Sequence, residues 1–272
     1  MHSKNPKFRP LNPHRGTVQN SIEFIIMKYG WKPDLPDFRD KKFLFEVLDV
    51  LPESVDLRDD MPPIYDQQAL GSCSANALSG AIEYDQTKNK MASVFIPSRL
   101  FIYYQERSIE NTIDSDSGAM LRDGIKACNT FGVCPEDLWS YDISKFTQNP
   151  TKEAYDSAIN HKIVSYRTVE QDLNSLQTAL ASGYPIIFGI TVYSSLEGAQ
   201  VAQTGIVPMP DPSENCLGGH AILLCGYNNA TKLFTFRNSW GNWGDKGYGY
   251  LSYDYVLNPG LASDFWLISS VE

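Results

Sequence analysis

Cys73 is the residue of this 272-residue chain whose position most favours nucleophilic chemistry. It follows Gly71-Ser72 at the start of a helix that the spacing of apolar residues predicts over 74–88. Unpaired backbone N–H groups and the helix dipole at a helix N-terminus stabilise a thiolate, the reactive form of cysteine. A cysteine at a helix start is more often a packing residue, so a function also requires a partner that can hold a proton.

The chain has four histidines, and one of them is well placed to be that partner. His220 lies in Gly218-Gly219-His220-Ala221, at the mouth of a strand predicted over 221–227. A strand is a rigid support from which a side chain can be aimed. His2 and His14 lie in a polar N-terminal arm and His161 in a polar stretch. Taken alone, His220 is better explained as a structural histidine.

Asn238 follows His220 by eighteen residues, at the end of another predicted strand. An asparagine oxygen can accept the ring N–H of a histidine, which fixes the tautomer and orientation of the imidazole. Trp240 and Trp243 lie among glycines just beyond. These indoles either cap the core or shield a histidine–asparagine contact from water.

The order and spacing of these residues resemble the papain family of cysteine peptidases. In that family the histidine and asparagine lie about 130–150 residues after the cysteine, and His220 follows Cys73 by 147 residues. The resemblance covers residues 51–272 and is carried by four ordered motifs: Leu51-Pro52-Glu53-Ser54-Val55-Asp56-Leu57-Arg58, Gln67 with Cys73, Gly219-His220-Ala221, and Asn238-Ser239-Trp240-Gly241.

The resemblance implies a role for each of these residues. Cys73 would be the nucleophile, His220 the general base and later the acid, and Asn238 the residue that orients the imidazole. Gln67 would donate to the oxyanion together with the backbone N–H of Cys73, and Trp240 would cover the histidine–asparagine hydrogen bond. The implied reaction is peptide-bond hydrolysis through a thiolate–imidazolium pair and an acyl-enzyme, with neither cofactor nor metal.

The sequence departs from the family pattern beside the nucleophile. Leu70 stands where the family usually has a cysteine, and Ser74 where it has a tryptophan. Asp116-Ser117-Gly118-Ala119 stands where the family has a glycine pair that binds the substrate backbone. The implied substrate-binding residues are Ser117, Gly118, Ala119, Gly219 and Trp240, and small apolar walls near Ala119, Met120, Gly218 and Gly219 favour a hydrophobic side chain in the main pocket. Tyr65-Asp66-Gln67 and Gly132-Val133-Cys134-Pro135 resemble a microbial branch of the family.

The elements that must position these residues fall into a helical first half and a strand-rich second half, which predicts an α+β fold. Ser72 is expected to cap the helix over 74–88. The resemblance implies two lobes with the active-site cleft between them: a helical lobe over about 60–165 and an antiparallel, β-barrel-like lobe over about 166–272. The other predicted helices cover 97–108, 118–131 and 172–182, and the predicted strands cover 186–192, 221–227, 232–237, 247–253 and 265–269.

Residues 1–50 form an extension that the resemblance does not cover. Residues 1–20 carry four Lys/Arg and no acidic residue, and residues 29–40 contain two prolines and few periodic apolar positions. This second stretch is typical of an extended segment lying on another surface. Leu51 lies where relatives often begin after maturation. We therefore hypothesise that 1–50 is a pro-segment, with part of 20–45 over the cleft; the alternative is an extension that only braces the fold.

Composition excludes several other classes of protein. The formal net charge is −9, from 23 Lys+Arg and 32 Asp+Glu, which argues against a nucleic-acid or anionic-membrane binder. No apolar run approaches the roughly 18 residues that span a bilayer. Five cysteines are too few for a disulfide-built scaffold, and no signal peptide is apparent, so secretion and a cytoplasmic location both stay open. The expected partners are a peptide or protein substrate and the chain's own N-terminal segment, with the protein a monomer.

Three alternatives compete with the hydrolase interpretation. Cys128, Cys134, Cys216 and His220 supply four zinc-ligand types, although not at the usual short spacing. A non-catalytic homologue would use the cleft only to bind peptides. A ligase or transpeptidase would form the same acyl-enzyme and pass the acyl group to an amine.

Overall fold

The computed structural model describes residues 28–44 and 50–271 of the chain. The helices in these ranges are α1 (Cys73–Lys88), α2 (Arg99–Ile109), α3 (Leu121–Thr130), α4 (Lys152–Ala158), α5 (Leu173–Ala181), α6 (Ala199–Thr204) and α7 (Tyr253–Leu257). The strands are β1 (Trp31–Lys32), β2 (Ser54–Asp56), β3 (Ala119–Met120), β4 (Ile163–Thr168), β5 (Ile186–Tyr193), β6 (Cys216–Asn228), β7 (Leu233–Arg237), β8 (Tyr248–Ser252) and β9 (Ala262–Val271).

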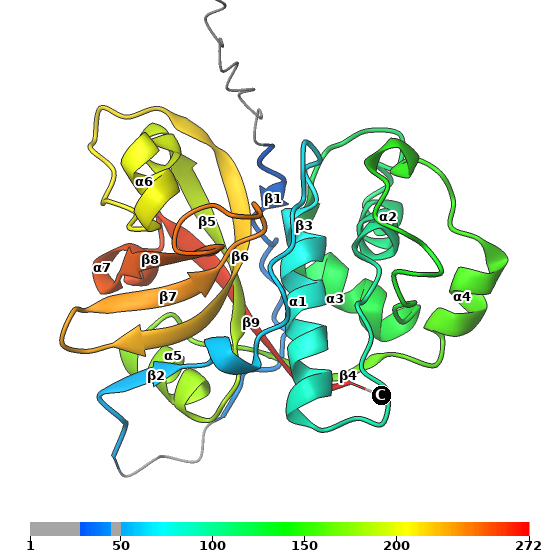
Figure 1. Cartoon of the computed structure of the whole chain (residues 1–272), viewed down its shortest axis with the longest axis horizontal. Helices are drawn as coiled ribbons and strands as arrows, with labels where there is room; N and C mark the ends of the chain where they lie inside the picture. The colour runs from blue at the N-terminus through cyan, green and yellow to red at the C-terminus, as the bar shows by residue number, and fades with distance from the viewer. Residues whose placement is uncertain (1–27, 45–49, 272) are drawn as a thin grey trace, which may run out of the picture.

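Most of the strands form one antiparallel sheet in the order β4-β9-β5-β6-β7-β8, with β2 paired to β6. Helices α2, α3 and α4 lie together on the other side of the molecule, and α1 runs between them and the sheet (Figure 1). Helices plus an antiparallel sheet confirm the predicted α+β class. The layout also brings residues from both halves of the chain to the junction along α1.

Two hydrophobic clusters stabilise the two sides. One contains α1 residues such as Leu78 together with Ile125 of α3 and Trp266 of β9. The other lies within the strand-rich part and contains Phe188, Phe234 and Leu251, among others. Because α1 packs on the first cluster along nearly its whole length, its N-terminal end is held firmly beside β6.

Ser72 does not cap α1 as the sequence predicts. The helix begins at Cys73, and the Ser72 side chain accepts no backbone N–H of the first turn. Its hydroxyl lies 2.6 Å from the Tyr141 hydroxyl and accepts instead from the Asn76 amide at 3.1 Å. The side chain is therefore used to tie the loop before Cys73 to the helical side of the molecule.

The predicted position of His220 within its strand is also wrong. β6 starts at Cys216, so His220 lies inside the strand rather than at its mouth, with Ile190 of β5 as its neighbour in the sheet. Gly218 and Gly219 resemble a turn in sequence, but β5 pairs with both of them. This pairing fixes the backbone of His220 more tightly than a strand end would.

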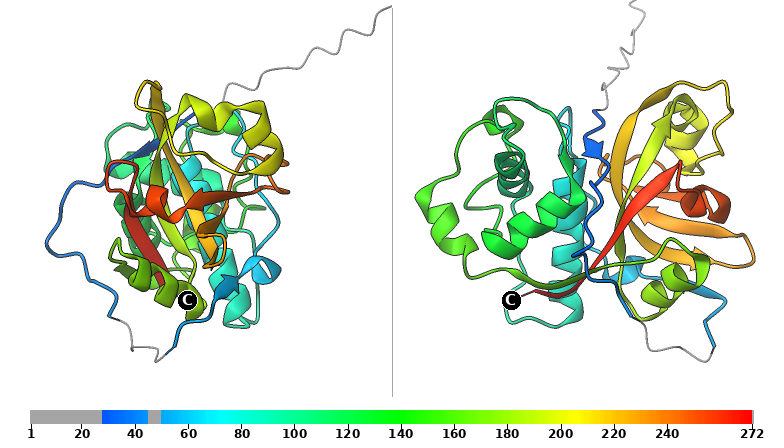
Figure 2. Two further views of the ribbon diagram at one scale, coloured as in Figure 1. Left: turned by 90° about the vertical axis from the view of Figure 1, so that its left-hand side faces the viewer. Right: turned by 180° about the vertical axis from the view of Figure 1, so that it is seen from behind.

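An N-terminal strap, which we define as residues 28–44, runs along the junction between the two sides (Figures 1 and 2). β1 in the strap pairs in parallel with β3, where Trp31 faces Ala119 and Lys32 faces Met120. At its other end Phe43 donates its N–H to the Thr168 carbonyl of β4 at 2.8 Å. The strap is therefore bound to the rest of the molecule near both of its ends, and residues 20–27 and 45 of the predicted covering segment lie outside the described ranges.

No helix in residues 28–44 and 50–271 is long and apolar enough to cross a membrane.

Candidate active site

Cys73 lies at the first residue of α1 and its side chain is buried. Burial raises the pKa of the Cys73 thiol to about 11, and the backbone N–H groups of Ala221, Gly30 and Ser74, which face the sulfur, oppose this shift only in part. The sulfur therefore contacts the strap on one side and, on the other, the residue that follows His220. With the strap in place, these surroundings favour the neutral thiol.

His220 and Asn238 form a direct hydrogen bond, with 2.8 Å between Nε2 and Oδ1. The Asn238 Oδ1 atom also accepts the backbone N–H of Ser239 at 2.8 Å, which identifies it as the oxygen. The Nε2 atom must then carry the proton, so Nδ1 is the free nitrogen of the neutral ring. Nδ1 is buried and has no hydrogen-bond partner within the described ranges. The ring is thus fixed in the tautomer that can take a proton on Nδ1.

The imidazole is dry and shielded. Trp240 stacks on His220 with 4.5 Å between ring centroids and 24° between ring planes. Trp243 packs edge-on against Trp240. Burial lowers the pKa of His220 to about 4, and the Asn238 hydrogen bond opposes this only in part. Both indoles therefore belong to the core cluster, as one alternative predicted, and Trp240 also covers the histidine, as the other predicted.

Gln67 is fully buried beside the same residues. Its Oε1 accepts the Ser239 hydroxyl at 2.7 Å, which leaves Nε2 as the donor. That Nε2 donates to two carbonyl oxygens, those of Leu70 and Lys28, each at 3.0 Å. The Lys28 carbonyl belongs to the strap. A side-chain donor near Cys73 is therefore already bound to a carbonyl oxygen of the chain itself.

Four glycines allow the strap to approach this closely. A Cβ on Gly30 would lie 1.8 Å from the Gly71 carbonyl oxygen, and one on Gly118 would lie 1.9 Å from the Gly30 oxygen. Trp31 is 7% exposed, and Cβ atoms on Gly189 or Gly219 would overlap its indole. The strap backbone thus passes between the Cys73 loop and residues 117–119, with the Trp31 indole buried beyond them.

The residues predicted to bind substrate lie around the strap. Ala119 donates its N–H to the Gly30 carbonyl at 2.7 Å, which is the edge pairing expected for a bound peptide. Gly118 packs against the same Gly30 carbonyl, and Gly219 packs against Trp31. The Ser117 hydroxyl lies 3.2 Å from the Gly118 carbonyl oxygen. Tyr29 packs edge-on against His220 and Trp240. Four of the five predicted residues therefore contact the strap: Gly118, Ala119, Gly219 and Trp240.

The structure accounts for the unusual Ser74. Its hydroxyl donates to the Glu106 carboxyl at 2.8 Å, and both side chains are buried. Burial raises the pKa of Glu106 well above its usual range, which favours the neutral carboxyl group. A polar pair therefore fills the space beside the nucleophile position. No motif in the sequence signals this pair.

Within the described ranges no group of three or more His, Cys, Asp or Glu side chains could hold a metal ion. The five cysteines are free thiols, and only Cys216 is exposed.

Comparison with known proteins identifies the family. The papain family cysteine protease domain matches residues 51–265. An uncharacterized peptidase C1-like protein of Acanthamoeba polyphaga mimivirus is 40% identical over 274 residues, which covers 91% of this chain and 88% of the viral protein. The chain is therefore a member of the papain family of cysteine proteases.

A solved structure gives a particular relative. Xylellain, a cysteine protease from Xylella fastidiosa, is 42% identical, with a TM-score of 0.84 over 90% of this chain and 96% of that one. Procathepsin L 3 from the larval midgut of Tenebrio molitor is 19% identical with a TM-score of 0.69, covering 89% of this chain and 76% of that one, so this similarity shows the fold alone. The fold, the enzyme class and the resemblance to a microbial branch are thus confirmed.

Proposed function

We propose that this cysteine protease is an endopeptidase in which Cys73 is the nucleophile, His220 the general base and acid, Asn238 the orienting residue and Gln67 an oxyanion donor. The observation that carries this proposal is the His220–Asn238 hydrogen bond, which leaves the buried Nδ1 atom of His220 free to take a proton. The next residue, Ala221, directs its backbone N–H at the Cys73 sulfur, so the imidazole and the thiol belong to one site. Residues 51–272 would be the peptidase domain, with lobes over about 60–165 and 166–272, and the protein would be a monomer.

The proposed reaction proceeds in two halves. The Cys73 thiolate attacks the peptide carbonyl carbon, and the oxyanion is held by Gln67 Nε2 and the Cys73 backbone N–H. The C–N bond breaks as the His220 imidazolium gives its proton to the leaving amine. His220 then takes a proton from water, the resulting hydroxide attacks the thioester, and the C–S bond breaks to restore the thiolate.

Substitution of the nucleophile tests this mechanism. In a chain that begins at Leu51, and so lacks the residues that cover Cys73, Cys73→Ala should abolish cleavage of a peptide library. An epoxide thiol trap should label Cys73 in the Leu51 chain and should not label its Cys73→Ala variant. Cys225→Ala is a matched control because Cys225 is also buried but lies at the far end of β6. Cleavage that persists in Cys73→Ala would refute the assignment.

We also propose that the strap keeps the enzyme inactive as a zymogen. The sulfur faces the Gly30 amide N–H rather than a carbonyl carbon, and the Gly30 carbonyl is bound by Ala119 instead. Gln67 is occupied by the Lys28 carbonyl at 3.0 Å. The strap thus occupies the predicted substrate-binding site without presenting a peptide bond that the sulfur can attack. This arrangement supports the interpretation of the strap as an inhibitor and not only as a structural brace.

Gly30→Ala in the full-length chain tests the zymogen proposal. The added methyl group would collide with the Gly71 carbonyl oxygen, so the strap cannot seat and peptidase activity should rise by at least about 10-fold, the effect of about 1.4 kcal/mol. Gly260→Ala is the control, because Gly260 is exposed and its Cβ would meet only the Asn258 side chain, at 3.2 Å. A chain beginning at Leu51 should behave like Gly30→Ala. Equal activity of the unaltered chain, Gly30→Ala, Gly260→Ala and the chain beginning at Leu51 would show that the strap only braces the fold.

A further inference from the structure

Asp116 places a carboxylate beside the loop that precedes Cys73. Its Oδ1 accepts the Gly71 backbone N–H at 3.0 Å and the Tyr103 hydroxyl at 2.6 Å. Tyr103 in turn accepts the Gly118 backbone N–H at 3.1 Å. The side chain of Asp116 is only 9% exposed. This carboxylate is therefore rigidly held between the two backbone segments that close on the strap.

The second Asp116 oxygen binds a lysine of the strap. The distance from Lys28 Nζ to Asp116 Oδ2 is 2.7 Å, and the backbone carbonyl of the same lysine accepts from Gln67 Nε2 at 3.0 Å. Lys28 thus binds the proposed oxyanion donor with its backbone carbonyl and Asp116 with its side-chain ammonium group. The Lys28 side chain is 51% exposed, so this contact lies at the rim of the site.

Asp116 is also next to the strap residue that faces the sulfur. A Cβ on Gly71 would lie 3.0 Å from Asp116 Oδ1 and 3.5 Å from the Gly30 Cα. Only Gly71 therefore separates the carboxylate from the place where a substrate residue would bond to Cys73. Because Gly71 and Gly118 close tightly on this place, a long side chain has room only towards the rim, where Asp116 lies.

We propose that Asp116 makes this protease select lysine or arginine as the residue that supplies the attacked carbonyl. This inference rests on the proposed function. A fixed carboxylate with limited access to water attracts a cation more strongly than a fully solvated one does. In the intact chain the Lys28 ammonium group binds the Asp116 carboxylate. After release of the strap, a basic side chain of the substrate binds there in place of Lys28. Asp116 is a specificity-determining residue of the same cleft.

The test compares two peptide substrates that differ only at the acyl residue. One has lysine there, and the other has norleucine, which has the same carbon chain without the charge. Both are assayed with full-length Gly30→Ala, and kcat/KM for lysine should exceed that for norleucine by about 10- to 100-fold. Asp116→Asn in this background keeps an acceptor for Gly71 and Tyr103 and removes the charge. It should lower the lysine-to-norleucine ratio to within about 3-fold of unity.

A matched control removes the same charge elsewhere. Asp156 lies on α4, is 62% exposed and pairs with Lys152, so Asp156→Asn should leave the ratio as it is. A ratio near unity before any Asp116 substitution overturns the inference. So does an Asp116→Asn variant that loses both activities equally, because Asp116 then only holds the loop.

Failure of the proposed function would look different. If Cys73→Ala in the same background still cleaves either peptide, the nucleophile assignment is wrong whatever the ratio is. If Gly30→Ala does not fold, full-length Trp31→Ala takes its place, since it removes the largest buried side chain of the strap without a new steric clash. The salt dependence gives a second readout, because a charge-based preference should weaken as ionic strength rises.

Discussion

The charge state of the Cys73–His220 pair depends on how much water reaches it. In the strapped chain burial raises the pKa of the thiol to about 11 and lowers the pKa of the imidazole to about 4, so both groups are neutral near pH 7. An ion pair of thiolate and imidazolium needs the opposite shifts. Since Gly30 is one of the groups covering the sulfur, removal of the strap is expected to move both pKa values towards the ion pair.

Alkylation of Cys73 by iodoacetamide should follow this change. In the full-length chain the rate should rise only as the pH approaches the thiol pKa of about 11. In Gly30→Ala the rate should already be high at pH 6, because a thiolate beside imidazolium has a pKa well below that of a free thiol. The measurement is the rate against pH, followed by mass spectrometry at Cys73. Superimposable profiles would show that the strap does not control ionisation.

Gln67→Ala tests the oxyanion donor. Loss of one such donor typically costs about 10²–10³ in rate, so kcat/KM in the Gly30→Ala background should fall by that factor without reaching zero. Gln148→Ala is the control, since Gln148 is an exposed glutamine on the helical side. A change of less than about 3-fold at Gln67 would mean that Nε2 only braces the Leu70 loop.

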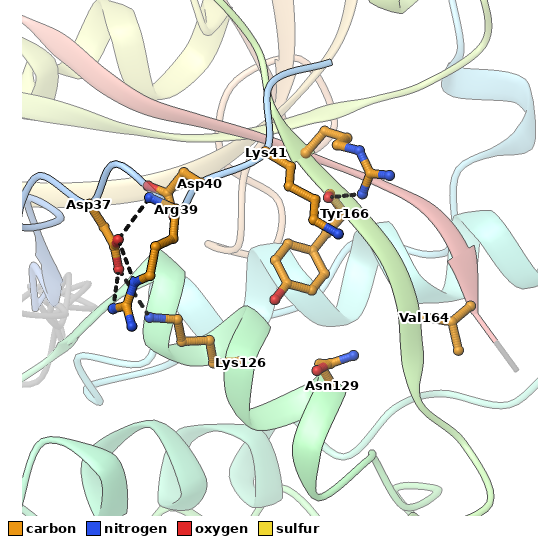
Figure 3. A pocket seen from close by; sticks show the side chains of 9 residues that line it. Asp37, Arg39, Asp40, Lys41, Lys126, Asn129, Val164 and Tyr166 are labelled. Carbon is orange, nitrogen blue, oxygen red and sulfur yellow. Dashed lines mark hydrogen bonds and ion pairs between the residues drawn. The ribbon is translucent and has the colours of Figure 1, made fainter. Parts of the chain in front are cut away.

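At the scale of elements, the strap is held by charged groups along most of its length. Lys32 pairs with Glu110 at 2.7 Å, and Asp40 pairs with Arg122 of α3 at 2.5 Å. Figure 3 shows the part of the strap between these two ion pairs, where Asp37 and Arg39 pair with each other at 2.6 Å near Lys126 of α3. These residues line a cavity of about 420 Å³ with Asp40, Lys41, Asn129, Val164, Tyr166 and Arg167.

One strap carboxyl differs from the others. Asp34 is buried, and burial together with the nearby Asp264 raises its pKa to about 7. Asp264 accepts the Asp34 N–H at 2.8 Å; the Asp34 carboxyl itself accepts from the Arg122 backbone at 3.0 Å and from the Trp266 indole at 2.9 Å. The Arg122 guanidinium lies 4.0 Å away and opposes the shift only in part. The docked strap therefore favours a protonated Asp34.

Docking of the strap should consequently weaken as the pH rises. Asp34 has an ordinary pKa of 3.8 when released, so its contribution is complete below about pH 4 and is lost as the pH rises to about 7. A synthetic peptide of residues 28–43 should inhibit Gly30→Ala on the order of 50-fold less tightly at pH 7 than at pH 5. With Asp34→Asn in the peptide the change should shrink to about 5-fold or less.

Asp40→Asn in the same peptide is the control for that experiment. It removes the ion pair with Arg122 and should weaken inhibition at both pH values alike. Tighter inhibition at pH 7 than at pH 5 by the unaltered peptide would contradict the assignment of Asp34.

At the scale of the whole molecule, the strap joins the two sides of the junction. Tyr29 donates to Glu197, which lies just after β5, whereas Lys32 binds Glu110 at the end of α2. Trp31 between them belongs to the cluster that contains α1 and β9. The strap thus contacts both the sheet side and the helical side, and its release should loosen the contact between them.

Thermal unfolding of full-length Gly30→Ala should report this loss. Truncating a buried tryptophan typically costs about 3–5 kcal/mol, and release of the strap exposes Trp31 in the same way. For a chain of this size that corresponds to a Tm lower by about 5–10 °C at pH 5, measured by calorimetry. Gly260→Ala should stay within about 2 °C of the unaltered chain. An unchanged Tm for Gly30→Ala would show that the strap contributes no net stability.

The sequence predicted the helices α1, α2, α3 and α5 and the strands β5 to β9, because each has apolar periodicity or a run of β-branched and apolar residues. It did not predict α4, α6, α7 or the short strands β1, β2 and β3, which are too short for a periodic pattern and exist through tertiary contacts. It also missed β4, whose residues after Ile163 are all exposed or half-buried and so show no alternation of apolar and polar positions. It also misplaced the start of β6, since Gly218 and Gly219 have no strand propensity of their own. Their pairing with β5 overrides that propensity.

The residue pattern alone was enough to identify the family, the order of Gln67, Cys73, His220 and Asn238, and an unusual N-terminal extension. Their surroundings became visible only in the folded chain: Nδ1 of His220 is the free nitrogen, Gly30 faces the sulfur, and Asp116 binds Lys28. The physical reason is that burial, tautomer and ion pairing depend on groups far apart in the chain. No local pattern encodes a contact such as that between Lys28 and Asp116, which are 88 residues apart.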